Sequence, residues 1–149
     1  MNIYFDMDGT LVDFYGVNNW LNYLLKEDTM PYLIAAPRFN MSVFARYIHR
    51  LQADGHKVGI ISWCSKKGSP SFNMEIEAVK LKWLAKHLPS IRWDEIHIVP
   101  YGTPKFSIVD CKESVLFDDE ENNRWVWEMN GGFALDAENI IENMKFMLS

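Results

Sequence analysis

The 149-residue chain contains little cysteine and no long hydrophobic run. Its two cysteines, Cys64 and Cys111, are too few for a disulfide framework in a chain of this size, so we expect reduced thiols and a cytoplasmic location. No apolar run approaches the length of a membrane span, and the first residues carry no basic leader of the kind found in signal peptides. The sequence therefore predicts a protein without a membrane partner.

Basic residues are outnumbered by acidic ones. Lys and Arg total 15 against 20 Asp and Glu, which gives a formal net charge of −5. This excess argues against general nucleic-acid binding, although a local metal ion or lysine can still bind a small anion. Hydrophobic residues make up 48% of the chain, which excludes disorder and predicts one domain spanning 1–149. These bulk properties leave the oligomeric state open.

The strongest signal lies in the first ten residues, where the apolar run 3–5 is followed by Asp6, Asp8, Gly9 and Thr10. Side chains two apart on an extended chain point to the same side, so the two carboxylates face one space. Like charges this close need a cation or a proton between them, and oxygen ligands suit Mg²⁺. Gly9 permits a sharp turn that brings main-chain N–H groups near a bound anion. An ordinary strand end with an Asp-Gly turn is the alternative, and the full pattern favours a functional site.

Apolar patterning predicts strands that alternate with helices. The strands are expected at residues 2–5, 57–62, 95–99, 114–117 and 133–135. The helices are expected at 18–27, from Asn40 or Ser42 to Gly55, and at 73–87, 121–129 and 137–148. This alternation predicts an α/β, Rossmann-like three-layer sandwich with a mainly parallel sheet of about five strands. In such sheets, ligands bind at the carboxyl ends of the strands.

The polar residues of the chain gather at these predicted strand ends. Asp6 and Asp8 follow the first strand, Ser62 ends the second, and Asp118 and Asp119 follow the fourth. A lysine, at position 105, lies in the loop after the third strand. The topology is therefore expected to bring these side chains to one edge of the sheet.

In this order, the residues resemble the haloacid dehalogenase (HAD) superfamily of phosphohydrolases across essentially the whole chain. The first motif of that family, a strand ending in DxDGT, matches residues 6–10. The second, an apolar strand ending in Ser or Thr, matches 58–62, and the third, a lysine, is best matched by Lys105. The fourth, an apolar strand ending in paired aspartates, matches 115–119. The resemblance implies the fold predicted above and hydrolysis of a small phosphorylated substrate.

The resemblance also implies a two-step phosphoryl transfer that depends on Mg²⁺. Asp6 would form an aspartyl-phosphate, and Asp8 would protonate the leaving oxygen and then deprotonate water. Mg²⁺ would be held by the Asp6 carboxylate, the main-chain carbonyl of Asp8 and Asp118. Asp119 would support these ligands from outside the coordination sphere; a direct ligand and a helix N-cap are its alternatives.

Phosphate binding is expected from Ser62 and Lys105, with Gly9 and Trp63 beside them. For Ser62, the alternative is a hydroxyl that merely satisfies a main-chain group at a strand end. For Lys105, the alternative is a solvated loop lysine, with Lys112 as the rival phosphate ligand. Both functional interpretations are favoured by the motifs that surround these residues.

Substrate selection in this family depends mainly on an inserted cap, for which residues 14–45 are available here. Five aromatic side chains offer stacking surfaces for a planar base, although packing in the core is the default for each: Trp20, Tyr23, Tyr32, Phe39 and Trp63. The apolar stripe within 18–27 is likewise expected to pack into the core rather than contact a ligand. The motifs are similar to those of the 5′(3′)-deoxyribonucleotidase branch, which implies a (deoxy)nucleoside monophosphate as substrate, but the cap is shorter than in that branch.

Two readings without turnover compete with the phosphatase. A receiver-like phosphoacceptor domain also combines paired carboxylates, a hydroxyl, a lysine and Mg²⁺ on a parallel sheet. In receivers, however, the acidic pair comes early and the phosphorylated aspartate lies mid-chain, whereas here DxDGT is first and the acidic pair is late. A non-catalytic HAD-like phosphate-binding module is the second alternative, and the complete set of candidate catalytic residues argues against it.

Overall fold

A five-stranded sheet forms the centre of the protein. The computed structural model describes residues 1–148, and the strand order is β3-β2-β1-β4-β5 with all neighbours parallel. The strands are β1 (Asn2–Phe5), β2 (Lys57–Trp63), β3 (Glu95–Val99), β4 (Ser114–Phe117) and β5 (Phe133–Leu135). The predicted α/β fold is confirmed. The order places β1, with the acidic motif at its carboxyl end, in the middle of the sheet.

Both faces of β1 are buried, which explains why this strand is apolar without alternation. Ile3 and Phe5 belong to the core on one face, and Tyr4 belongs to the smaller core on the other. Phe5 stacks on Phe117 of β4 with ring centroids 4.9 Å apart, and it packs edge-on against Phe44 at 5.1 Å. The acidic motif therefore starts from a firmly anchored strand.

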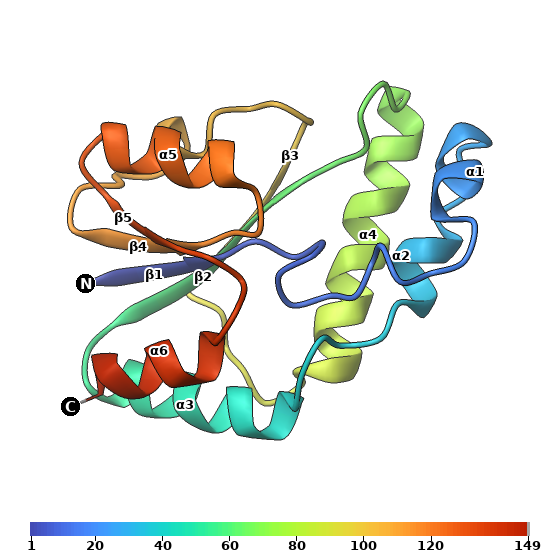
Figure 1. The fold of residues 1–149 in the computed structure, drawn as a ribbon. Coiled ribbons are helices and arrows are strands. Elements are labelled where there is room, and N and C mark those ends of the chain that lie inside the picture. Colours follow the sequence, from blue (N-terminus) through green and yellow to red (C-terminus); the bar gives the residue numbers. More distant parts are fainter. Residues whose placement is uncertain (149) are drawn as a thin grey trace.

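Helices cover both faces of the sheet (Figure 1). One face carries α3 (Met41–Ala53) and α6 (Ile140–Met147), and the other carries α5 (Glu121–Met129) together with a 3-10 turn, η1 (Lys105–Ser107). This arrangement gives the three layers expected from the sequence.

Three more helices stand beyond the carboxyl edge of the sheet, on the right of Figure 1. They are α1 (Trp20–Leu25), α2 (Met30–Ile34) and α4 (Pro70–His87). α2 packs against α4, and the indole N–H of Trp83 donates to the main-chain oxygen of Ala35 at 2.8 Å. Because α3 already begins at Met41, the last part of segment 14–45 covers the sheet, and only α1 and α2 are left to form a cap.

Local sequence sets the first turns of the two long helices. Asn40 Oδ1 accepts from the N–H of Val43 at 3.0 Å and caps α3, one of the two caps expected there. Ser69 Oγ accepts from the N–H of Phe72 at 3.2 Å and caps α4, with Pro70 in the first turn. α4 therefore starts three residues before the predicted position 73, because a Ser-Pro pair can open a helix as well as form a loop.

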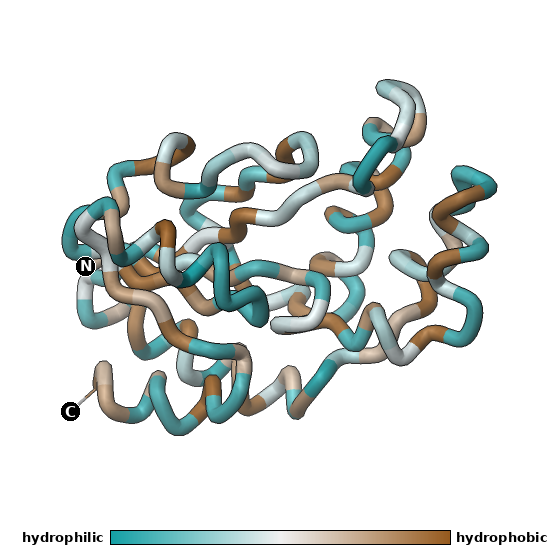
Figure 2. Tube along the Cα trace, turned by 45° about the horizontal axis from the view of Figure 1, so that its top comes forward, coloured by the Kyte–Doolittle hydropathy of each residue, from teal (hydrophilic) through white to brown (hydrophobic). Residues whose placement is uncertain are grey.

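Hydropathy follows this arrangement: Figure 2 shows hydrophobic, brown segments along the central strands and hydrophilic, teal segments on the outer turns.

Cys64 and Cys111 are both buried as free thiols, in agreement with the sequence. Within residues 1–148, none of the helices combines the length and the apolar character that crossing a membrane requires.

Candidate active site

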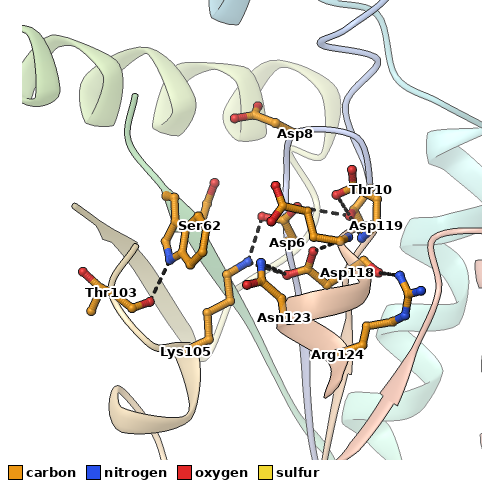
Figure 3. Close-up of polar contacts among 12 residues, drawn as sticks. Asp6, Asp8, Thr10, Ser62, Thr103, Lys105, Asp118, Asp119, Asn123 and Arg124 are labelled. Atoms are coloured by element: carbon orange, nitrogen blue, oxygen red, sulfur yellow. Dashed lines mark hydrogen bonds and ion pairs between the residues drawn. The ribbon is translucent and has the colours of Figure 1, made fainter. Parts of the chain in front are cut away.

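The carboxyl edge of the sheet brings the predicted residues together (Figure 3). Asp6 follows β1, Ser62 lies near the end of β2, and Asp118 follows β4, while Lys105 reaches in from η1. All four side chains are buried. Buried polar groups need partners, so their contacts define what the site can bind.

A tight turn after β1 shapes the site. The main-chain N–H groups of residues 10–12 all point at the carbonyl oxygen of Met7, at 3.0 Å each. Gly9 makes the turn possible with a φ of +83°, and a Cβ at this position would collide with the carboxylate of Asp119. Its own N–H donates to the carbonyl of Val12 at 2.8 Å. Gly9 thus contributes the turn and the close approach of Asp119, because its N–H is already engaged within the turn.

Lys105 neutralises two of the site's carboxylates. Its Nζ lies 3.0 Å from Asp6 Oδ1 and 2.7 Å from Asp118 Oδ2, and its side chain is only 4% exposed. Burial alone would lower the pKa of Lys105, but the two adjacent carboxylates outweigh it and raise the pKa above its usual value, so the ammonium is retained. Lys112, the rival lysine, is exposed on the surface. The structure therefore places Lys105, and not Lys112, beside Asp6.

Asp6, Asp118 and Asp119 form an acidic cluster in which one carboxylate oxygen from each lies within 4.8 Å of the others. Burial, followed by the nearby charge of Asp6, raises the pKa of Asp119 to about 8. One ammonium cannot balance three ionised carboxylates, so the cluster holds either a proton, which the raised pKa of Asp119 favours, or a further cation that displaces it. The all-oxygen donor set and the spacing fit Mg²⁺.

Hydrogen bonds divide the roles of the two late aspartates. Asp118 accepts from Lys105, from the N–H of Glu120 at 2.9 Å and from the amide of Asn123 at 3.1 Å. Asp119 accepts from the hydroxyl of Thr10 at 3.2 Å. The oxygens of Asp118 are largely occupied by donors, whereas those of Asp119 keep more capacity for a metal ion.

Asp8 points away from the acidic cluster and toward α4 (Figure 3). Its Oδ2 lies 2.9 Å from Nζ of Lys80, in the middle of α4. The Asp8 side chain is 18% exposed, whereas that of Lys80 is 2% exposed. The two carboxylates of DxDGT thus have separate partners: Lys105 for Asp6 and Lys80 for Asp8.

The sequence prediction missed Lys80. Within α4, Phe72, Ile76 and Leu84 form a buried stripe at helical spacing, and position 80 falls four residues from both Ile76 and Leu84. A lysine on an apolar stripe is the signal that was available. The partner of such a lysine cannot be read from helical spacing, because it depends on how the helix packs against distant loops.

Ser62 and Trp63, both expected near the phosphate, have defined partners. Ser62 Oγ lies 2.6 Å from Nζ of Lys80. The indole N–H of Trp63 donates to the carbonyl of Thr103 at 2.8 Å, and its ring covers the Lys105 ammonium at 5.5 Å. Trp63 therefore offers a ring face to this region, because its indole N–H is already bonded.

A cleft of about 300 Å³ opens from Asp6 and Asp8 toward α1 and α2. Its walls are mostly aromatic and aliphatic, and they include Phe14, Tyr15, Trp20, Leu21, Leu24, Leu25, Tyr32, Trp63 and Tyr101. The exposed Lys66 also lines the cleft, and its Nζ lies 5.9 Å from the centre of the Tyr101 ring. Charged side chains lie at the bottom of the cleft and apolar side chains form its walls. This combination suits a ligand with an anionic end and an apolar or planar body.

The expectation that the stripe within 18–27 packs into the core is met only in part. No residue of α1 is fully buried, and its apolar side chains line the cleft, although Trp20 and Leu24 also touch the core. Leu21 and Leu25 stay exposed, so this part of α1 forms a wall of the cleft instead of core. Of the five candidate stacking residues, Tyr23 and Phe39 lie outside this cleft, by other surface hollows.

No protein-family model and no curated protein matches the sequence. Among solved structures, D,D-heptose 1,7-bisphosphate phosphatase from Burkholderia thailandensis is similar with a TM-score of 0.64 and 12% identity, over 99% of this chain and 98% of that one. A HAD family enzyme from Bacteroides thetaiotaomicron is similar with a TM-score of 0.59 and 12% identity, over 97% of both chains.

A third similar structure is the D,D-heptose 1,7-bisphosphate phosphatase from B. bronchiseptica in complex with magnesium and phosphate. It has a TM-score of 0.55 and 14% identity, over 89% of this chain and 78% of that one. These likenesses extend over nearly the whole chain, with the sheet and its flanking helices in common. The chain therefore has the fold of the haloacid dehalogenase superfamily.

Proposed function

We propose that this protein is a Mg²⁺-dependent phosphatase that hydrolyses phosphomonoesters through an aspartyl-phosphate on Asp6. The setting of Asp6 is the observation that carries the proposal. Its carboxylate lies at the end of the central strand, 3.0 Å from the Lys105 ammonium and beside two further carboxylates suited to a metal ion. Fixed positive charges of this kind let a carboxylate approach a phosphoryl group, which is the main requirement of phosphoryl transfer.

The first half-reaction forms the intermediate. A carboxylate oxygen of Asp6 attacks phosphorus, while the bond from phosphorus to the ester oxygen breaks. Asp8 gives its proton to that leaving oxygen, so the alcohol departs neutral. Ser62 and Lys105 donate to the phosphoryl oxygens, beside the ring of Trp63. Gly9 supports this step through the turn that aims Asp6 and Asp8.

The second half-reaction restores the enzyme. The Asp8 carboxylate takes a proton from water, whose oxygen attacks phosphorus. The bond between phosphorus and the Asp6 oxygen breaks, which releases inorganic phosphate and leaves Asp8 protonated for the next cycle. The same two aspartates thus serve both steps.

For the metal, we propose Asp6, the main-chain carbonyl of Asp8 and the Asp118–Asp119 pair. Bound Mg²⁺ supplies positive charge that stabilises the phosphoryl group. The sequence favours Asp118 as the ligand, whereas the greater free capacity of its neighbour favours Asp119. On the structural argument, Asp119→Asn is expected to raise the Mg²⁺ concentration needed for half-maximal activity more than Asp118→Asn does.

For the substrate, we propose a phosphomonoester with a planar aromatic body, such as a (deoxy)nucleoside monophosphate. The similar heptose bisphosphate phosphatases are named for a sugar phosphate, which is a polyol. A polyol needs many polar partners, but this cleft presents the rings of Trp20, Tyr32 and Trp63. Aromatic faces suit a planar base better than a sugar.

The test is release of inorganic phosphate from a panel of nucleoside 5′- and 3′-monophosphates, sugar phosphates and an aryl phosphate. We expect release that requires Mg²⁺, that stops with a chelator and that falls by more than about 1,000-fold in Asp6→Asn. Asp54→Asn, on the exposed end of α3, is the matched control and should leave the rate unchanged. A wild-type rate retained in Asp6→Asn would contradict the nucleophile assignment.

A non-catalytic phosphate-binding module predicts a different result from the same panel. The protein would bind phosphate with Mg²⁺ but release none from any ester. A best substrate among the sugar phosphates would instead support the phosphatase and reject the planar-body proposal.

A further inference from the structure

Lys80 has a setting that the proposed reaction does not explain. Its Nζ lies 2.9 Å from Asp8 Oδ2, 2.6 Å from Ser62 Oγ and 2.7 Å from the carbonyl oxygen of Trp63. An ammonium group has three N–H donors and no acceptor, so these contacts use all of its donors. The ring of Tyr32 lies 5.2 Å from the same nitrogen and closes the site from the cap side.

Packing alone does not explain a charge at this position. Position 80 continues the apolar stripe of α4 that includes Ile76 and Leu84, where an aliphatic side chain would fit the pattern. Burying an ammonium is costly, and apolar residues that replace a buried ion pair often leave stability unchanged or raise it. The groups that this ammonium contacts therefore indicate its function.

We infer that Lys80 is a positioning residue that orients Asp8 and Ser62 for phosphoryl transfer; this inference rests on the proposed phosphatase function. Its contact with Asp8 is made through Oδ2. This contact fixes the rotation of the carboxylate and leaves Oδ1 as the oxygen that carries the proton to and from the reacting atoms. The ion pair thus selects one oxygen of Asp8 for proton transfer.

The contact with Ser62 also has a direction. Because Lys80 can only donate, Ser62 Oγ is the acceptor between them. The hydroxyl hydrogen of Ser62 must then point away from Lys80, where it is free to donate to a phosphoryl oxygen. One ammonium thereby prepares both the proton-transfer group and a phosphate ligand.

The third contact fixes these two groups relative to each other. The Trp63 carbonyl belongs to the end of β2, whereas Asp8 belongs to the turn after β1. A single nitrogen in α4 bonded to both holds the turn after β1 and the end of β2 at a constant separation. Misplacement of a catalytic group by about 1 Å costs about 100-fold in rate, so this tie matters for turnover.

The decisive experiment compares two esters in Lys80→Met. An alkyl phosphate needs protonation of its leaving oxygen, whereas p-nitrophenyl phosphate has a good leaving group that needs little protonation. We expect kcat/KM to fall about 100-fold for the alkyl ester but less than about tenfold for the aryl ester, since positioned general acids contribute about 10²–10⁴-fold. Equal losses on both esters, or no loss on either, would overturn the inference.

The control is Lys82→Met, an exposed position on the same helix with the same loss of charge. It should leave both rates unchanged. Urea unfolding verifies that Lys80→Met remains folded. If it does not fold, Lys80→Arg takes its place with the same expectation, because a guanidinium keeps the charge but cannot place three donors on one nitrogen.

A binding measurement separates this inference from the proposed function. If the wild-type protein hydrolyses no ester, the phosphatase proposal has failed, and titration with inorganic phosphate and Mg²⁺ then decides the role of Lys80 toward Ser62. We expect Lys80→Met to weaken phosphate binding about tenfold, with little further loss when Ser62→Ala is added, as coupled residues show. Wild-type phosphate affinity in Lys80→Met would overturn the inference in that case.

Discussion

The carboxylate of Glu27 receives two hydrogen bonds from Ser69, which lies at the start of α4. The main-chain N–H of Ser69 donates to Oε2 at 2.8 Å, and its hydroxyl donates to Oε1 at 2.9 Å. Glu27 follows α1, which lines the cleft, and Ser69 ends the loop whose residues 64–66 also line it. This pair therefore ties the end of α1 to the start of α4, next to the residues that line the cleft.

Glu27→Gln should loosen the cleft without damage to the chemistry. An amide has only one acceptor oxygen, so one of the two bonds is lost. We expect KM for a nucleoside monophosphate to rise about fivefold, or about 1 kcal/mol, the net value of a hydrogen bond, with kcat unchanged. Steady-state kinetics on this ester and on glycerol phosphate would show the effect only for the larger substrate. Equal changes with Glu75→Gln, an exposed position on α4, would contradict the role of the pair.

Lys105→Met should affect both activity and stability. It leaves the carboxylates of Asp6 and Asp118 without their shared ammonium, and removal of one partner of a buried ion pair costs about 3–5 kcal/mol. Phosphatase activity should fall by at least about 100-fold, as for removal of a charge-stabilising donor. Urea unfolding and phosphate release test the two effects. Lys112→Met is the matched control, and an equal loss there would reassign the phosphate lysine.

Gly9→Ala should disrupt the acidic cluster. Gly9 has a φ of +83°, and an added Cβ would meet the Asp119 carboxylate. Gly55→Ala is the control, because it has a φ of +94° but nothing within 4 Å of the added Cβ. Both variants bear the backbone cost of about 1–2 kcal/mol. Only Gly9→Ala should also weaken Mg²⁺ binding, by about tenfold or more, as measured by calorimetry. Equal Mg²⁺ affinities in the two variants would show that this close approach is unimportant.

Away from the site, Tyr4 on β1 reaches across β2 to Glu95 on β3, where its hydroxyl donates to Oε2 at 2.7 Å. Its ring passes over Gly59, where a Cβ would lie within 2.9 Å of the ring. His97 lies 3.0 Å from the other carboxylate oxygen. Burial opposes ionisation of Glu95, but these two partners outweigh it and lower its pKa below the ordinary 4.5.

This shift predicts how stability depends on pH. A carboxyl group with a lowered folded-state pKa stabilises the fold above its unfolded-state pKa, and this contribution is lost as pH falls through the folded-state value. The free energy of unfolding of the wild type should therefore decrease below pH 4.5 relative to Glu95→Gln. Urea midpoints measured from about pH 6 to pH 3 provide the test. A constant difference between the two proteins over this range would contradict the shift.

The framework of the fold could be predicted from the sequence because its central strands, β1, β2 and β4, are buried on both faces. The runs at 3–5 and 115–117 are apolar without interruption, and Asp6 and Asp118 mark where they end. The topology of parallel sheets then brings these ends together. In such cases, local pattern and global fold agree, so the candidate site was largely predictable.

The contacts of α4 and α1 could not be predicted in the same way. The turn after β1 supplies one acceptor to Lys80 and the end of β2 supplies two, and none of the three is near Lys80 in sequence. Likewise, the apolar face of α1 has the pattern of a core helix. Whether such a face meets another layer or a cleft depends on the neighbouring elements, which helical periodicity does not encode.

The measurement that tests the central claim most directly is a rapid-quench experiment with a phosphomonoester labelled in its phosphoryl group. Acid quenching during turnover with Mg²⁺ should trap the label on the protein, and mass spectrometry of the digest should locate it on the peptide that contains Asp6. Asp6→Asn should trap none. Steady turnover with no label on the protein, or label that persists in Asp6→Asn, would contradict the account.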